Sequence, residues 1–188
     1  MTHSGTHTYL FGGDKPWHAE SWVASDDRVR GGKSQSHLDY SPESKEAVRF
    51  YGELDITALG GAGFASQRSP DPQHWDLSSF HGLRLATKSG DGKKYTLILK
   101  DEILPRRPDG REQSTVSWEY DFRGGAGIEL DIPWQSLKAT YRGKPVPDAK
   151  PLDVANIKRI SIMMRSFFGD QEGPFDLELQ HIIATTFP

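Results

Sequence analysis

Alternation of apolar and polar residues constrains the fold of this chain more than any other feature of its sequence. In PFDLELQHIIA (174–184), every second residue from Phe175 to Leu179 is apolar, and the residues between and just after them are polar. Successive side chains of a strand point to opposite faces, so such a segment forms a strand with one face on a core and the other in water. The same pattern occurs at 47–56, 82–88, 94–100, 115–122, 127–134 and 157–167. With strands expected around Val29 and Phe64, about nine strands are predicted.

Helical periodicity is missing, and turn-forming residues are frequent. Only PWQSLKATY (133–141) has the proline start and later glycine of a short helix, of one or two turns. Asp-Gly pairs in SGDGKK (89–94) and RPDGRE (107–112) predict two loop tips, the first of them a tight hairpin. Many strands without a repeat of fixed length predict an all-β fold, a two-sheet antiparallel β-sandwich.

The length of 188 residues is sufficient for one domain with its own core. Residues 1–16 are expected to be a loosely held N-terminal arm, and residues 17–188 a single β-sandwich domain. The proline-rich segment YRGKPVPDAKPLD (141–153) is short enough to be a loop that crosses one end of the sandwich.

Composition excludes several classes of function. The formal charge of -3 gives no bulk attraction for nucleic acid, and the absence of cysteine excludes disulfides, thiolate metal sites and a cysteine nucleophile. No apolar run is long enough to span a membrane, and the N-terminal residues lack the patterns of a signal peptide or a mitochondrial presequence. A cytoplasmic protein is therefore expected, with no cofactor and with an oligomeric state that the sequence does not specify.

The segment GGKS, which ends at Ser34, looks like the end of a phosphate-binding loop. The position at which such a loop needs its first glycine is Asp27, and a poor helix start follows, so nucleotide binding is not predicted. One interpretation is structural: the two glycines allow a bulge in an early strand, and Asp27 fixes the preceding turn by hydrogen bonds. In the other interpretation, Asp27, Arg30 and Ser34 face a ligand-binding cleft.

Further candidate ligand-binding residues are two arginines and a tryptophan. Arg68 at a strand end and Arg142 in the crossing loop are suited to bidentate recognition of carboxylate or phosphate, although surface arginines also form ordinary ion pairs. Trp75, in the loop PDPQHWDLSSF (70–80), is the tryptophan most expected to be exposed.

Histidines do not predict a metal site. Only His3 and His7 have metal-ligand spacing, and both lie in the expected arm. His74 and His81 are loop residues that can titrate near neutrality. No Gly-x-Ser-x-Gly elbow is present, which argues against a hydrolase of that type.

Seven motifs occur along nearly the whole chain in one order: SDDRVRGGKSQS (25–36), FYGELD (50–55), GAGFASQRS (61–69), LSSFHGLRLATKSGDGKKYTLILK (77–100), IPWQSLKATYRGKPV (132–146), LDVANIKRISIMM (152–164) and GPFDLELQHI (173–182). On these motifs the chain resembles the complex I intermediate-associated protein 30 family. The resemblance implies a domain similar to the galactose-binding jelly roll, a binding or assembly function, and a link to mitochondria.

Three functions follow as hypotheses. The first is a non-catalytic module that recognises a protein partner or a small ligand through loops at one end, with Arg30, Arg68 and Arg142 as polar anchors and Trp75 as an apolar one. The second is an enzyme that holds a small metabolite in the cleft and polarises it with arginine or histidine. The third is carbohydrate binding. A deep pocket with His74, His81 or an arginine converging on it, and a perturbed protonation state, favours the enzyme. A broad apolar patch favours protein docking, and a shallow groove with a flat exposed tryptophan favours sugar.

Overall fold

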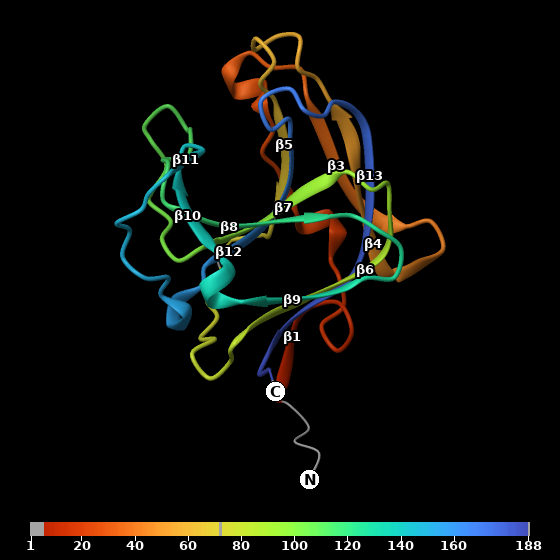
Figure 1. The fold of residues 1–188 in the computed structure, drawn as a ribbon, viewed down its shortest axis with the longest axis vertical. Coiled ribbons are helices and arrows are strands. Elements are labelled where there is room, and N and C mark those ends of the chain that lie inside the picture. The colour runs from red at the N-terminus through yellow and green to blue at the C-terminus, as the bar shows by residue number, and fades with distance from the viewer. Residues whose placement is uncertain (1–5, 72, 188) are drawn as a thin grey trace.

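The computed structural model describes residues 6–71 and 73–187, which form two antiparallel β-sheets packed face to face (Figure 1). The predicted two-sheet sandwich is therefore confirmed. The first sheet has the order β3 (Gln35–Ser41), β4 (Ser44–Leu54), β13 (Gly173–Thr185), β6 (Gly82–Gly90) and β9 (Glu129–Pro133), and β1 (His7–Phe11) also pairs with β13. The second sheet has the order β11 (Lys144–Pro145), β10 (Lys138–Tyr141), β8 (Ser117–Arg123), β7 (Lys94–Lys100), β12 (Arg159–Arg165), β5 (Phe64–Arg68) and β2 (Val23–Ala24).

Four short 3-10 helices connect the strands. They are η1 (Ala19–Ser21), η2 (Asp27–Arg30), η3 (Trp134–Ser136) and η4 (Val154–Asn156). No helix within residues 6–71 and 73–187 is long and apolar enough to cross a membrane.

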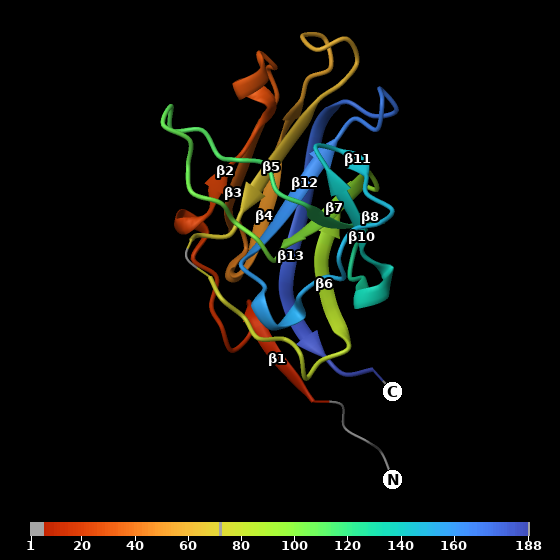
Figure 2. The same cartoon turned by 90° about the vertical axis from the view of Figure 1, so that its left-hand side faces the viewer.

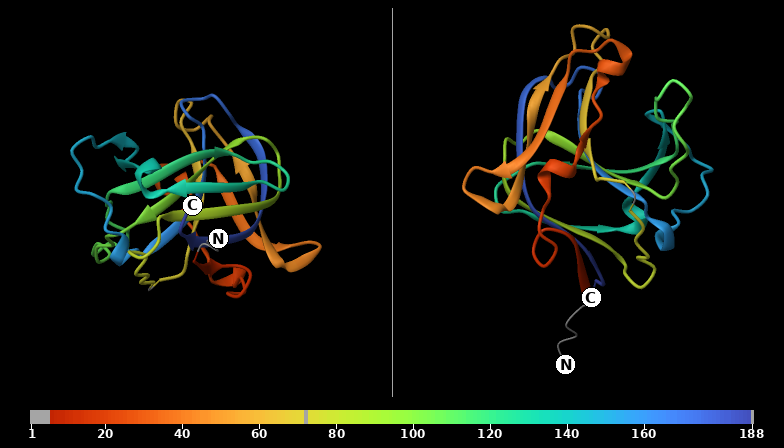
Figure 3. Two further views of the ribbon diagram at one scale, coloured as in Figure 1. Left: turned by 60° about the horizontal axis from the view of Figure 1, so that its bottom comes forward. Right: turned by 180° about the vertical axis from the view of Figure 1, so that it is seen from behind.

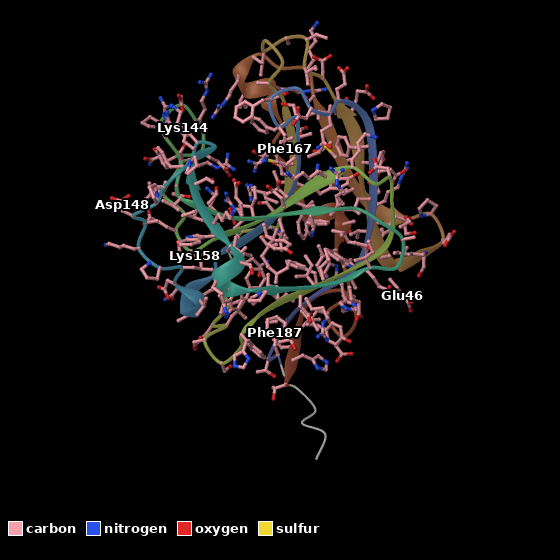
Figure 4. All side chains as sticks on the ribbon, viewed as in Figure 1. Glu46, Lys144, Asp148, Lys158, Phe167 and Phe187 are labelled. Atoms are coloured by element: carbon pink, nitrogen blue, oxygen red, sulfur yellow. The ribbon has the colours of Figure 1, made fainter. Side chains whose placement is uncertain are left out.

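The core lies between the two sheets, where side chains from both fill the space (Figure 4). The alternation predicted in β13 is confirmed, because Phe175, Leu177 and Leu179 are 3%, 0% and 1% exposed. Alternate residues of the opposing strands β7 and β12 are buried in the same cluster, among them Leu97, Leu99, Ile160 and Ile162. The residues between these buried positions of β7 and β12 point away from the core, to the outer face of the second sheet.

The turn at Asp91 joins the two sheets and does not form the predicted hairpin. β6 belongs to the first sheet and β7 to the second, so the two strands do not pair. The Asp91 carboxylate accepts hydrogen bonds from the Tyr95 hydroxyl at 2.9 Å and from the Asp176 backbone N–H at 2.9 Å. The turn chemistry was identified correctly, but it makes a crossover between layers.

The strand predicted around Val29 is wrong, since this segment is the 3-10 helix η2. Gly31 ends it in the left-handed conformation, with a φ of 83°, which glycine adopts without steric cost. The segment therefore lacks the alternation of a strand: Arg28 and Arg30 are exposed, and so is Val29. The predicted helix after Pro133 is a single 3-10 turn, η3, followed by β10.

The N-terminal segment differs from the expected loose arm over residues 7–16. β1 pairs with β13 in register from His7 opposite Thr185, and its last residues Leu10 and Phe11 are buried in the core. β1 and the end of β13 lie side by side at one end of the sandwich (Figure 3). The first five residues of the expected arm, including His3, lie outside the described part of the chain.

Candidate functional site

A groove with a cavity of about 410 Å³ lies on the outer face of the second sheet. Figure 2 looks onto this face, where the green connection between β7 and β8 passes in front of β5. In β12 the residues between the core positions, Arg159, Ser161 and Met163, line the groove. β5 and β7 contribute alternate residues in the same way: Ser66, Arg68, Ile98 and Lys100. The strand alternation thus places polar and charged side chains together on one face.

Two buried arginines, Arg68 and Arg159, line the groove. Ser161 of β12 lies opposite Arg68 of β5, so Arg159 is the diagonal neighbour of Arg68 across this strand pair. The Asp71 carboxylate accepts from Arg68 Nη1 at 3.1 Å and from Arg159 Nη2 at 2.6 Å. The Glu112 carboxylate lies 3.2 Å from Arg68 Nη2 and 3.3 Å from Arg159 Nη1. Two guanidinium groups thus share two carboxylates.

Lys100 adds a third positive charge beside this pair. It lies directly opposite Arg159 in the β7–β12 register, an arrangement of like charges that is unfavourable by itself. Burial lowers the pKa of Lys100, and the positive charge of Arg159 lowers it further. Lys100 Nζ donates to the carbonyl and hydroxyl oxygens of Thr115 at 3.0 and 2.9 Å. The cluster therefore contains three cationic residues and two carboxylates.

Arg30 and Arg106 also line the groove, and both are exposed. Arg30 comes from η2, and its guanidinium lies 5.8 Å from the centre of the Phe64 ring. Arg106 comes from the β7–β8 connection, residues 101–116. Five cationic residues and two carboxylates thus line one cavity on a chain whose formal charge is -3. Such a local excess of positive charge attracts an anionic group.

Of the predicted binding residues, the structure brings Arg30 and Arg68 together in this groove. Asp27 and Ser34 do not line it, because both are fully buried. The Asp27 carboxylate accepts from the backbone N–H groups of Ser34 at 3.0 Å and Phe64 at 3.1 Å. The Ser34 hydroxyl donates to the Asp55 carbonyl at 3.2 Å. These contacts agree with the structural role expected of Asp27, whereas the expected bulge is wrong because Gly31 ends a 3-10 helix and not a strand.

Trp75 lies at a different cavity, of about 690 Å³. The side chain is half-buried rather than fully exposed, and its ring meets Phe11 edge-on with centroids 5.6 Å apart. The backbone N–H of Trp75 donates to the carbonyl of Ile157 at 2.8 Å, which ties this loop to the chain just before β12. The other aromatic side chains around this cavity are Tyr9, Phe11, Trp22 and Phe80.

Arg142 does not line the groove but supports its wall. It is exposed, has a φ of 51°, and donates from Nε to the Ser114 hydroxyl at 3.2 Å. Ser114 itself lines the groove. Arg142 therefore contacts the end of the β7–β8 connection from outside.

Each of the two candidate histidines has a hydrogen-bond partner within the fold. His74 Nε2 lies 2.7 Å from Asn156 Oδ1, and His81 Nδ1 accepts from the backbone N–H of Phe187 at 3.1 Å. In the part of the chain that the structure describes, no three His, Cys, Asp or Glu residues are grouped so as to hold a metal ion.

Sequence reasoning missed Arg159, Lys100, Asp71 and Glu112. Arg159 begins RISIMMR, whose alternation with buried Ile160 and Ile162 marks it as outward-facing, so a signal for it existed. Lys100 ends the KYTLILK stretch in the same manner. Glu112 follows a loop tip, and nothing in the local sequence indicates that it returns to the sheet.

The fold is a two-sheet antiparallel β-sandwich similar to solved jelly-roll domains. The family 11 carbohydrate-binding module of Clostridium thermocellum, solved in complex with a β-1,3-1,4-mixed-linked tetrasaccharide, superimposes with a TM-score of 0.64 at 13% identity, covering 97% of each chain. An agarase superimposes with a TM-score of 0.52 at 11% identity, over 97% of this chain and 25% of the agarase.

Sequence comparison identifies the family. The model of the complex I intermediate-associated protein 30 family matches residues 9–179, and the chain belongs to this family. An uncharacterized protein of Schizosaccharomyces pombe is 43% identical over 181 residues, which are 93% of this chain and 82% of that protein. The resemblance stated from the motifs is confirmed.

Proposed function

We propose that this chain is a non-catalytic binding module of the assembly-factor type, which recognises an anionic group of a small ligand or a protein partner in the groove on its second sheet. The observation that carries this proposal is the set of five cationic residues against two carboxylates in one cavity. The family to which the chain belongs is described by its association with a complex I intermediate, and the carbohydrate-binding module of similar fold holds an oligosaccharide. Both support recognition rather than chemistry.

Carbohydrate binding in this groove is less well supported. Sugar rings commonly stack on flat aromatic side chains, and among the described residues no aromatic side chain lines the groove. The half-buried Trp75 lies at the other cavity. A charged ligand therefore fits the groove better than a neutral oligosaccharide.

An enzyme remains the second candidate, favoured by one observation. Lys100 has a lowered pKa and lies in the groove beside Arg159, and a perturbed group of this kind in a pocket is a candidate for acid–base work. Recovery of an unchanged ligand would distinguish binding from catalysis.

Native mass spectrometry of the protein purified from its own cells tests the proposal. The groove variant Arg30→Ala with Arg106→Ala removes two exposed charges from the lining, so the fold should be retained. The matched control is Arg28→Ala with Arg107→Ala, which removes neighbouring exposed arginines that do not line the groove. We expect a bound small molecule or partner chain in the wild type and in the control, and its loss from the groove variant. Retention of the same bound species by the groove variant would refute the assignment.

A further inference from the structure

Glu112 contacts the buried arginines from a segment that is exposed to solvent. In the connection 101–116, every residue from 104 to 113 is exposed. The Glu112 carboxylate nevertheless presents one oxygen to Arg68 Nη2 and the other to Arg159 Nη1, at 3.2 and 3.3 Å. A planar carboxylate that bridges two guanidinium groups is a favourable geometry for recognition of that anion.

The side chains of Asp71 and Glu112 are similarly exposed, at 36% and 38%, but they differ in how the chain holds them. Asp71 follows β5 closely, and the intervening Ser69 is tied to β12 through both its backbone N–H and its hydroxyl, which pair with Ile160. The shortest contact of Asp71 to Arg159 is 2.6 Å. Each contact of Glu112 is 3.2 Å or longer. Glu112 is therefore the more easily displaced of the two.

The connection keeps its own hydrogen bonds without the Glu112 contact. The backbone N–H of Arg107 donates to the carbonyl of Arg111 at 2.8 Å, and the Gln113 side-chain amide donates to the carbonyl of Pro105 at 2.7 Å. Its base is held separately, since Lys100 Nζ donates to Thr115. Withdrawal of the Glu112 side chain would break none of these bonds.

We propose that Glu112 is an internal stand-in for the ligand, and that the natural ligand presents a carboxylate which replaces that of Glu112 on Arg68 and Arg159. This inference rests on the proposed function of the groove and names the class of its ligand. The connection acts as a tethered competitor: a free carboxylate binds only to the fraction of molecules in which Glu112 has left the arginines. Its apparent affinity is lowered by that fraction.

Isothermal titration with citrate at low ionic strength tests this inference, because salt screens such contacts. The variant Glu112→Gln removes the competing charge at nearly constant size, and Glu102→Gln is the matched control, an exposed glutamate of the same connection that does not line the groove. We expect Glu112→Gln to bind citrate about tenfold more tightly than the wild type, which corresponds to loss of a competing contact of about 1.4 kcal/mol. The control should match the wild type, and thermal unfolding verifies that both variants fold.

A second variant tests the geometry. Glu112→Asp keeps the charge but shortens the side chain by one methylene, so it should compete less well and give an intermediate affinity. Equal citrate affinity in the wild type and Glu112→Gln, no citrate binding to either, or an equal gain in Glu102→Gln would overturn the inference. An equal gain for inorganic phosphate would overturn the assignment to carboxylates.

The two proposals fail in different experiments. If native mass spectrometry finds a species whose binding depends on Arg30 and Arg106 while Glu112→Gln has no effect on citrate, the inference falls and the binding function stands. If the groove variant retains the bound species, the proposed binding function is refuted, whatever the result of the citrate titrations.

Discussion

Replacement of Asp27 by alanine should destabilise the fold strongly. The expected loss in the free energy of unfolding follows from the two hydrogen bonds that the Asp27 side chain accepts. The Asp27 side chain is fully buried and accepts from the backbone N–H groups of Ser34 and Phe64 at 3.0 and 3.1 Å. Alanine would leave both donors buried without this acceptor, at about 1–3 kcal/mol each. The expected loss in the free energy of unfolding is therefore about 2–6 kcal/mol, a large part of the about 5–15 kcal/mol typical of a domain.

Two further variants refine this prediction. Asp27→Asn keeps one good acceptor oxygen, so it should lose about half as much. A Cβ added at Gly32 would collide with the Asp27 carboxylate, so Gly32→Ala should have an effect similar to Asp27→Ala. Because both changes disrupt the same contacts, their effects should not add in the double variant.

Urea unfolding monitored by tryptophan fluorescence measures these differences. The control is Asp148→Ala, an exposed aspartate in the segment after β11, which should change the free energy of unfolding by less than about 0.5 kcal/mol. A loss of less than about 1 kcal/mol in Asp27→Ala would show that the buried carboxylate does not hold the segment, and would return Asp27 to the ligand-binding candidates.

Three further predictions concern other parts of the fold. Burial acts to raise the pKa of Glu178, but hydrogen bonds from Ser41 and Ser89 hold this pKa below the ordinary value of 4.5. The ionised Glu178 therefore stabilises the fold at a pH above 4.5, and this contribution is lost as the pH falls through the lower folded-state pKa. Ser41→Ala with Ser89→Ala should raise that pKa in an NMR titration of the carboxyl group, and an unchanged pKa would contradict the reasoning. Tyr95→Phe should cost about 1 kcal/mol in urea unfolding, because the buried hydroxyl donates to the turn carboxylate Asp91, and no loss would show that this bond is not needed. Phe168→Gly should stabilise by about 1 kcal/mol, because Phe168 is fully exposed at a φ of 62°; a lower melting temperature would indicate a packing role instead.

Alternation was sufficient to predict the long strands and the sandwich because each long strand buries one face. It failed for strands that are too short to show a period and for a strand whose buried residues are adjacent. β2 and β11 have two residues each, and both residues of each strand are exposed. β1 was missed because its buried residues, Leu10 and Phe11, are adjacent rather than alternating.

Sheet membership was not predictable from local chemistry. An Asp-Gly turn reverses the chain equally well within a sheet or between two sheets, so the turn at Asp91 gave no sign that it changes layer. The same limit applied to the site. Arg68 and Arg159 come together only because β5 and β12 pair. The residues that meet there are far apart in the sequence: Ser69 and Ile160, for example, are separated by 91 positions. No local sequence pattern specifies such a pairing.

Arg30 and Arg68 were selected for their chemistry, and the fold brings them to one groove. Asp27 was given two interpretations, and its burial favours the structural one. Arg142 was selected for the same chemistry, but its side chain contacts Ser114 and does not line the groove. Trp75 was chosen as an exposed loop residue, but exposure does not specify a direction, and it lies at the second cavity.

The pairing of β1 with β13 makes this fold a candidate for circular permutation. His7 lies opposite Thr185, and the backbone N–H of Thr186 donates to the carbonyl of Thr6 at 2.9 Å, so a short peptide could join the two ends without disturbing either sheet (Figures 1 and 3). New termini opened between Asp109 and Gly110, at an exposed turn, would make Glu112 the third residue from the new N-terminus. The number of residues added before Gly110 would then set the effective concentration of the Glu112 carboxylate at Arg68 and Arg159.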